Sequence, residues 1–321
     1  MTEKNNQRKY DVLVIGELNI DLILNDIPQF PEIGKEVLAG EIRQTLGSSS
    51  AIFANNLSIL GAKVAFLGKV GNDSYASDVR TSLKNGGVDT GYIMSSEGFK
   101  TGITVAMNFG NDRAMVTYTG AMNDLGREDI SDEVLSSARH LHVSSVFLQE
   151  KLKPGLVALF QRAKELGLST SLDPQWDPAE TWDLDLKALL PWVDVFLPND
   201  AEILNLTRTE TLRDAIQKLE SFCRLIVIKN GQKGALLWNG KELYHKQSYL
   251  NTEVVDAIGA GDSFNAGFIY RYIQQRPLEE CIDFGALTGA VNTTAAGGTG
   301  AFSSREAVFM TIKERFQRDL V

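Results

Sequence analysis

Cysteine and histidine are scarce in this chain of 321 residues. The two cysteines, Cys223 and Cys281, lie far apart with no C-x-x-C pair, so we expect buried thiols rather than a disulfide or a metal site. Among the three histidines, His140 and His142 fall in a strand-like run and are expected to be structural. Without H-E-x-x-H or a cluster of His and Cys, the sequence disfavours zinc enzymes and histidine-dependent hydrolases.

Long apolar runs and long basic runs are also missing. No apolar run approaches the ~18 residues of a membrane span, so we expect no membrane association. The net charge of −9 disfavours nucleic acid as a partner. The opening segment MTEKNNQRK lacks the apolar core of a secretory signal, and residues 1–9 are expected to form a disordered tail. We therefore expect a cytoplasmic protein that acts on small molecules.

Short apolar runs alternate with helical patterns through most of the chain. Several of the runs are apolar on both faces, which is typical of a parallel sheet covered by helices. The expected strands are 10–16, 63–70, 140–147, 168–173, 193–198 and 224–229. Helical patterns at 51–61, 74–87 and 154–167 each end in glycine. This alternation predicts an α/β fold, a doubly wound and mostly parallel sheet sandwiched by helices.

Two segments, residues 17–46 and 101–119, break this rhythm. The first contains alternating runs punctuated by proline, and the second is typical of a hairpin with the turn GNDR. Because neither is flanked by helices on both sides, we expect a small β-sheet that stands off the main domain as a lid. Extra edge strands on the main sheet are the alternative. No linker is visible, so residues 10–321 are expected to form one domain.

The stretch VVDAIGAGDSFNAGF at 254–268 is the most informative part of the sequence. It is neither a P-loop nor a G-x-G-x-x-G motif. The aromatic residues Phe264, Phe268 and Tyr272 recur every four positions and indicate one apolar helix face. Asp262 therefore lies at or near the first turn of a helix, where an ordinary N-cap is the simplest interpretation.

The small residues before Asp262 favour a second interpretation. Gly259, Ala260 and Gly261 allow backbone amides to point at one anion at a helix N-terminus. A carboxylate that bound the same anion would repel it. If Asp262 faces an alcohol instead, it accepts the proton of that alcohol while the amides hold the transferred phosphoryl group. The stretch therefore predicts a phosphotransferase with an alcohol as acceptor.

DAIGAGDSFNAGF resembles the C-terminal signature of the ribokinase-like (PfkB) carbohydrate kinases. The similarity covers about residues 10–315 and includes GELNIDL near the start, GKVGNDSYA at 68–76 and PNDAE at 198–202. It implies a kinase that uses ATP and Mg²⁺ to phosphorylate a sugar-like alcohol. It also implies a β-sheet lid, which often mediates homodimerisation.

The resemblance assigns roles to particular residues. Asp262 is implied to be the catalytic base, with Gly259, Ala260 and Gly261 as the anion hole. For the sugar, the implied residues are Asn19, Asp21, Gly47, Ser48 and Ser50. For the nucleotide they are Asn199, Glu202, Lys229, Gly231 and Gly234, with Asn199 and Glu202 ordering Mg²⁺ through water. A monovalent cation, K⁺, would involve Asp256, Ile258, Asn292, Ala295 and Gly297.

Simpler interpretations exist for two of these groups. Asn19 and Asp21 project to one side of a strand, which suits a sugar, but two polar residues on the lid surface would give the same pattern. Asn199 and Glu202 would look identical in a helix that merely starts with an acidic turn.

The chain also departs from the family pattern. Ser48 stands where the family has a second glycine, Ile52 where it has asparagine, and Ala257 where it has threonine. Ribokinases carry a glutamate near 144–150 that reaches ribose, and the stretch SSVFLQE has no clear counterpart of it. Asp177 stands where kinases of 2-keto-3-deoxygluconate carry an arginine, and an acid there would repel an acidic sugar. We therefore expect a neutral sugar, with Ser48 and Ser50 supplying hydroxyl groups.

Two alternatives remain open at this point. A nucleoside kinase of the same fold would need aromatic stacking, for which Phe109, Phe147 and Trp176 are candidates. A catalytically silent paralogue would bind a sugar or a protein partner without turnover. The intact Asp262 and the small-residue turn before it disfavour this last alternative.

Overall fold

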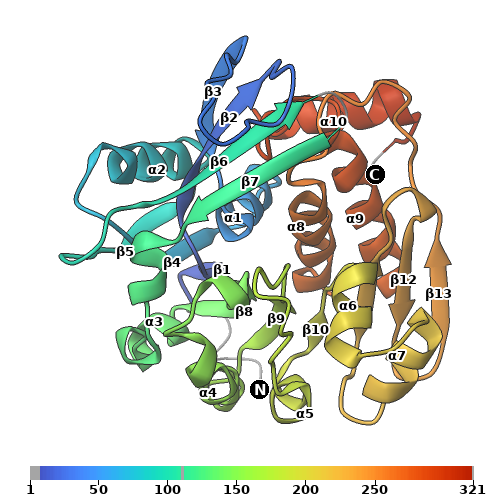
Figure 1. Ribbon diagram of the computed structural model, residues 1–321. Coiled ribbons are helices and arrows are strands. Elements are labelled where there is room, and N and C mark those ends of the chain that lie inside the picture. Colours follow the sequence, from blue (N-terminus) through green and yellow to red (C-terminus); the bar gives the residue numbers. More distant parts are fainter. Residues whose placement is uncertain (1–7, 110–111, 320–321) are drawn as a thin grey trace.

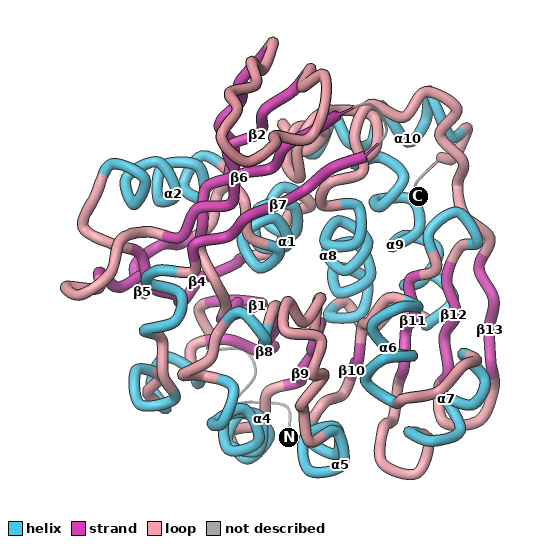
Figure 2. The backbone as a smooth tube through the Cα atoms, in the orientation of Figure 1, coloured by secondary structure: helices cyan, strands magenta, loops and turns pink. Residues whose placement is uncertain are grey.

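The computed structural model describes residues 8–109 and 112–319, in which most strands build one large sheet (Figures 1 and 2). Its order is β13-β12-β11-β10-β9-β8-β1-β4-β5. The strands are parallel from β5 to β11, while β12 and β13 run antiparallel at one edge. Their bounds are β1 Tyr10–Ile15, β4 Val64–Val70, β5 Asp89–Ser95, β8 Ala138–Ser144, β9 Ser169–Asp173, β10 Val195–Phe196, β11 Ile226–Lys229, β12 Ala235–Trp238 and β13 Leu243–Lys246.

Helices cover both faces of this sheet. In β1, Val12 and Val14 belong to one core and Leu13 and Ile15 to the other, because successive side chains of a strand point to opposite faces. The first core is completed by α1 Ser49–Ile59, α2 Ser74–Asn85, α8 Ala260–Ile273, α9 Leu278–Asn292 and α10 Arg305–Phe316. The second is completed by α3 Asp132–Ser136, α4 Leu156–Glu165, α5 Leu186–Leu189, α6 Asp200–Thr207 and α7 Leu212–Leu219. The predicted doubly wound α/β fold is confirmed.

A second sheet stands off the first (Figure 1). Its order is β3-β2-β6-β7, and its parallel pair, β2 and β6, joins the two segments predicted as a lid. The bounds are β2 Asn19–Asn25, β3 Glu41–Leu46, β6 Gly102–Phe109 and β7 Asp112–Tyr118. The four strands do not extend the edge of the main sheet, so the alternative of extra edge strands is wrong. Part of the predicted turn GNDR, residues 110–111, lies outside the described residues.

Several smaller expectations concern single residues. Of the expected tail, residues 1–7 lie outside the described part, and Arg8 donates hydrogen bonds to the carbonyl groups of Ala138 and Leu166. His140 and His142 are buried and both bond to the hydroxyl of Ser171, as structural histidines would. Both cysteines are free and buried. Within residues 8–109 and 112–319, no helix is long and apolar enough to cross a membrane.

Candidate active site

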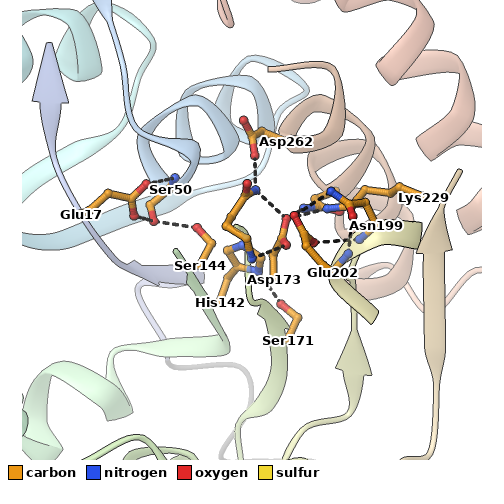
Figure 3. Close-up of polar contacts among 12 residues, drawn as sticks. Glu17, Ser50, His142, Ser144, Ser171, Asp173, Asn199, Glu202, Lys229 and Asp262 are labelled. Carbon is orange, nitrogen blue, oxygen red and sulfur yellow. Dashed lines mark hydrogen bonds and ion pairs between the residues drawn. The ribbon is translucent and has the colours of Figure 1, made fainter. Parts of the chain in front are cut away.

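The carboxyl ends of β1, β8, β9 and β11 meet the N-terminal ends of α1 and α8 in one place (Figure 3). In open α/β sheets, this edge is where ligands bind. Helix α8 starts there with the turn Gly259–Ala260–Gly261, and Gly259 is its N-cap with a φ of 76°. A side chain on Gly259 would approach the Cα of Gly298 to 2.6 Å, so both the backbone angle and the space require glycine.

Asp262 lies inside the first turn of α8 rather than at its cap. Its side chain is buried and accepts a hydrogen bond of 3.0 Å from the amide of Gln175. Burial, and then the nearby carboxylate of Asp173, raise the pKa of Asp262 well above its ordinary value. Because Gly259 caps the helix, the simple N-cap interpretation of Asp262 is wrong. Among the first-turn N–H groups, that of Ala260 donates to the carbonyl of Ala257 at 3.3 Å, whereas those of Gly261 and Asp262 have no partner within the helix and are available to an anion.

Asp173 lies at the centre of the site and contacts several of its polar side chains (Figure 3). It ends β9, is fully buried, and accepts hydrogen bonds from Asn265 and Gln175. Its Oδ2 lies 2.6 Å from the Nζ of Lys229. Lys229 also lies beside the glycine turn, since a Cβ on Gly261 would be 3.8 Å from its ammonium group. The ammonium is therefore placed to attract phosphate at the start of α8.

Asn199 and Glu202 form a reciprocal cap at the start of α6. The backbone N–H of Glu202 donates to Oδ1 of Asn199 at 2.8 Å, and the Asn199 side-chain amide donates to Oε1 of Glu202 at 2.7 Å. These bonds form a capping box, which agrees with the simpler interpretation of an ordinary helix start with an acidic first turn. Glu202 is nevertheless unusual, because burial and the neighbouring Asp173 raise its pKa to about 7.

The charge balance suits a hard cation nearby. The buried carboxylates of Asp173, Glu202 and Asp262 face one ammonium group, that of Lys229. Within the described residues, no three His, Cys, Asp or Glu side chains converge to bind a metal directly. The set therefore fits Mg²⁺ that keeps its waters and takes its direct ligands from phosphate.

On the lid side, Asn19, Asp21 and Gly47 are brought together. The Asn19 amide donates to Oδ1 of Asp21 at 2.8 Å and to the hydroxyl of Thr104 at 3.0 Å. A Cβ on Gly47 would collide with the side chains of both Asn19 and Asp21, so the glycine permits this close approach. Burial raises the pKa of Asp21 to about 6. These groups form a polar patch at the root of the lid.

Ser48 and Ser50 do not lie as expected. The Ser48 hydroxyl donates to the backbone carbonyl of Glu17 and accepts from the N–H of Ala51, as the N-cap of α1. Ser50 is completely buried, and its hydroxyl contacts the Glu17 carboxylate and the hydroxyl of Ser144. Both hydroxyls already have protein partners, which corrects the expectation that they bind sugar.

Two departures from the family pattern have structural explanations. Ile52 is buried and its side chain lies against Gly259 and Gly298, so it supports the glycine turn instead of facing a sugar. Asp177 is also buried, and its carboxylate accepts hydrogen bonds from Ala179, Thr181 and Trp182 within its own loop. These bonds hold the pKa of Asp177 low although burial opposes them. Repulsion of an acidic sugar by Asp177 is therefore not supported.

The loop at Gly231 and Gly234 follows β11 directly. Both glycines have positive φ, 52° and 94°, and a Cβ on Gly231 would meet open space. Among the aromatic candidates for base stacking, Phe147 is buried against Trp182, with 5.7 Å between ring centroids, and Phe109 packs on Phe30. Trp176 differs, since 46% of it is exposed.

The residues suggested for a monovalent cation are held by direct hydrogen bonds. The Asn292 amide donates to the carbonyl of Ile258 at 2.6 Å. The two carboxylate oxygens of Asp256 accept the N–H groups of Ile258 and Gly297. Ala295 follows in the same loop, and its N–H lies 3.4 Å from the carbonyl of Asn292. Direct hydrogen bonds from Asn292 and Gly297 therefore tie the two loops together.

Four residues of the site were missed at the sequence level: Glu17, Asp173, Gln175 and Asn265. Asp173 and Gln175 follow an apolar strand at the functional edge of a parallel sheet, which is a usable signal. Glu17 follows β1 in the same way. Asn265 lies one helical turn from Asp262 and became apparent only once α8 was placed against β9.

Comparisons with known proteins agree with this geometry. Residues 9–305 match the pfkB family carbohydrate kinases. An uncharacterized sugar kinase of Archaeoglobus fulgidus is 30% identical over 73% of this chain and 92% of its own length. An ATP-dependent ribose-1-phosphate kinase of Halopiger xanaduensis is 28% identical over 95% of this chain and 99% of its own length. A cytidine kinase of Thermococcus kodakarensis is 29% identical over 86% of this chain and 93% of its own length.

The fold has the same relatives. A putative ribokinase II from E. coli, whose crystal structure contains ATP and Mg²⁺, superposes with a TM-score of 0.82. The two chains are 24% identical, and the match covers 95% of this chain and 99% of the other.

Proposed function

The chain belongs to the pfkB family of carbohydrate kinases, and we propose that it transfers the γ-phosphate of ATP to a hydroxyl group of a neutral sugar. That it is an ATP-dependent sugar or nucleoside kinase follows from the family. The observation that carries the finer proposal is the position of Asp262. Its buried carboxylate lies in the first turn of α8, where the N–H groups of Gly261 and Asp262 have no partner within the helix, and near the ammonium of Lys229.

Each group then has a role in the transfer. The acceptor hydroxyl gives its proton to the carboxylate of Asp262 as its oxygen attacks the γ-phosphorus. The bond between that phosphorus and the β–γ bridging oxygen breaks, and ADP leaves. The N–H groups of the glycine turn and the Lys229 ammonium stabilise the charge on the transferred group. The raised pKa of Asp262 makes it a stronger base than a solvated aspartate once it is ionised.

Mg²⁺ bound to the nucleotide phosphates supplies charge neutralisation when it is present. Asn199 and Glu202 are the residues that would hold its waters, and Gly231 and Gly234 would border the nucleotide. Because Glu202 is buried close to Asp173, a nearby cation would stabilise its charged form.

The preference for a neutral acceptor rests on charge. Asn19, Asp21 and Gly47, the groups assigned to the acceptor, include a carboxylate and no cation. The ammonium of Lys229 lies instead beside Gly261, on the side proposed for the phosphate. An acidic or phosphorylated sugar would therefore be repelled on the acceptor side, whereas the hydroxyls of a neutral sugar can donate to Asp21.

The lid is proposed to close over the acceptor and to join two copies of the chain. Its strands expose large apolar side chains, with 65% of Ile42, 63% of Val116 and 50% of Tyr118 accessible. Exposed apolar surface of this kind commonly marks an interface. Light scattering would detect a dimer that Val116→Lys converts to monomer. A wild-type monomer at assay concentration would contradict the dimer proposal.

A nucleoside kinase is the second candidate, favoured by Trp176. Its exposed ring packs edge-on against Trp182, with 4.9 Å between ring centroids, and offers a rigid face to a base. The cytidine kinase relative gives this candidate further support.

One experiment separates these proposals. ATP and Mg²⁺ are offered with a panel of neutral sugars, acidic sugars and nucleosides, and the phosphorylated product is identified by ³¹P NMR. We expect product with a neutral sugar, and a loss of several orders of magnitude in Asp262→Asn. Product with nucleosides alone would favour the second candidate. ATP turnover that is independent of every acceptor would contradict both.

A further inference from the structure

Gln175 connects two buried carboxylates of the site, those of Asp173 and Asp262, which are labelled in Figure 3. Its side-chain nitrogen lies 3.0 Å from Oδ2 of Asp173 and 3.0 Å from Oδ1 of Asp262. An amide nitrogen carries two hydrogens, which suffices for one bond to each carboxylate. Asp173, which is paired with Lys229, also fixes the orientation of the amide, because a carboxylate in an ion pair accepts hydrogen bonds.

The backbone of Gln175 is held in an unusual conformation. Its φ is 60°, in the left-handed region that residues other than glycine and asparagine seldom adopt. It follows Pro174, two residues beyond the end of β9, and its own N–H bonds to Oδ1 of Asp173 at 3.3 Å. Such conformations persist where the surroundings fix them, and they concentrate at functional sites.

The charges around Asp262 show why this amide matters. Asp173 on β9 and Glu17 after β1 both disfavour ionisation of Asp262, and burial adds to their effect. Lys229 on β11 favours it, and so does a hydrogen bond from Ser49 on α1. Lys229 itself contacts Asp173. Gln175 is therefore the donor that lies between the two acids and reaches both.

We propose that Gln175 is a positioning residue for proton transfer: it anchors Oδ1 of Asp262, leaves Oδ2 for the acceptor hydroxyl, and screens Asp262 from Asp173. This inference rests on the proposed function, because it assigns Asp262 the role of base. Gln175 touches neither the acceptor nor the phosphate in this scheme. Its removal changes the reactivity of Asp262 and leaves acceptor binding unchanged.

The test compares Gln175→Leu and Gln175→Glu with the matched control Gln275→Leu. Gln275 is also a left-handed glutamine, with a φ of 59°, but it is exposed and lies beyond the C-terminal end of α8. The control therefore reports the cost of leucine in this backbone conformation away from the site. Rates are measured across pH with the best acceptor from the panel, and acceptor binding is measured by calorimetry with a non-hydrolysable ATP analogue.

We expect Gln175→Leu to lower kcat by roughly 10- to 100-fold, with acceptor affinity changed by less than about 3-fold. The acid limb of its pH–rate profile should move to higher pH, because a donor to the charged form is lost. Gln175→Glu should move the acid limb to still higher pH, since it places a third carboxylate beside Asp173 and Asp262. If Gln175→Leu matches Gln275→Leu in kcat and in the acid limb, the proposal is overturned.

A second readout does not depend on turnover. Loss of the donor raises the pKa of Asp262 further, so the melting temperature of Gln175→Leu should continue to fall with rising pH up to a higher pH than that of wild type. A decline that ends at the same pH in both proteins would overturn the proposal even in the absence of an active acceptor. An active wild type with an unaffected Gln175→Leu would remove this inference alone, whereas inactivity on every acceptor would remove the proposed function.

Discussion

Lys229 and Asp173 form a buried ion pair, with 2.6 Å between Nζ and Oδ2 and with only 11% and 1% of their side chains exposed. Glu202 and Asp262 both lie close enough to this pair to act on the charge of Lys229. Burial opposes the charge of Lys229, but the carboxylates of Asp173 and Glu202 outweigh it and raise its pKa. The ammonium of Lys229 therefore stabilises the negative charges of Asp173, Glu202 and Asp262.

Lys229→Met should destabilise the fold by about 3 kcal/mol or more, because it leaves Asp173 buried without its cation. The double variant Lys229→Met with Asp173→Asn should recover part of this loss, since the unpaired charge is removed as well. Urea unfolding of the two single variants and the double variant measures the coupling. Strictly additive effects would show that the pair contributes no interaction energy.

Asp262→Asn should raise the melting temperature while it removes activity. The pKa of Asp262 is higher in the folded state than in the unfolded state. The stability of the wild type therefore falls as pH rises and the folded state has to ionise this residue. The increase in melting temperature caused by Asp262→Asn should therefore be larger at pH 8 than at pH 5. Calorimetry at both pH values measures it, and an equal or reversed difference would contradict the raised pKa.

The fold could be predicted because its signals are local. Runs such as β4, which is buried along its whole length, and the glycine after each of three helices determine strand and helix order without knowledge of contacts. The lid was recognisable because 17–46 and 101–119 lack flanking helices. Its parallel pairing of β2 with β6 joins segments about 80 residues apart and leaves no local pattern.

The site was only partly predictable, and the reason is physical. Gly259 and Asp262 belong to one continuous motif, so their proximity is encoded in the chain order. Asp173 ends β9 and Gln175 follows it, whereas Asp262 lies in α8, 87 positions after Gln175 in the sequence. Ser50 shows the opposite error: its residue type suits a sugar, but its hydroxyl is consumed by Glu17 and Ser144, contacts that arise only from packing.

Glu17→Gln should stabilise the protein increasingly as pH rises. Glu17 is completely enclosed, and burial raises its pKa although Ser50 donates to it. The folded state holds its proton more tightly than the unfolded chain, so the stability of the wild type falls from about pH 4.5 up to the folded pKa. Glutamine is neutral and removes this loss. Between pH 5 and 9, the melting temperature of Glu17→Gln should exceed that of wild type by an amount that grows with pH. A difference that does not change with pH would contradict the raised pKa of Glu17.

Ser48→Gly and Ser48→Ala should differ in stability although both remove the same hydroxyl. Ser48 has a φ of 71°, where glycine is unstrained and alanine is not. Loss of the cap costs about 1 kcal/mol in the alanine variant and only a few tenths in the glycine variant. Relief of backbone strain adds about 1 kcal/mol in favour of glycine. Chemical denaturation should thus place Ser48→Gly about 1–2 kcal/mol above Ser48→Ala; similar values would contradict strain at this position.

Phosphotransfer should not require K⁺, because side-chain amides already tie together the loops on which the glycine turn rests. Asn292 bonds to the carbonyl of Ile258, and Asn56 bonds both to the carbonyl of Gly298 and to Ser263, which in turn donates to Asn292. The measurement compares rate and melting temperature in potassium and tetramethylammonium chloride at equal ionic strength. Asn292→Ala opens the tie, so this variant should lose activity and melt earlier in both salts. Saturable activation of the wild type by K⁺, or a melting temperature that rises with K⁺ alone, would show that a cation and not the asparagine amide joins these loops.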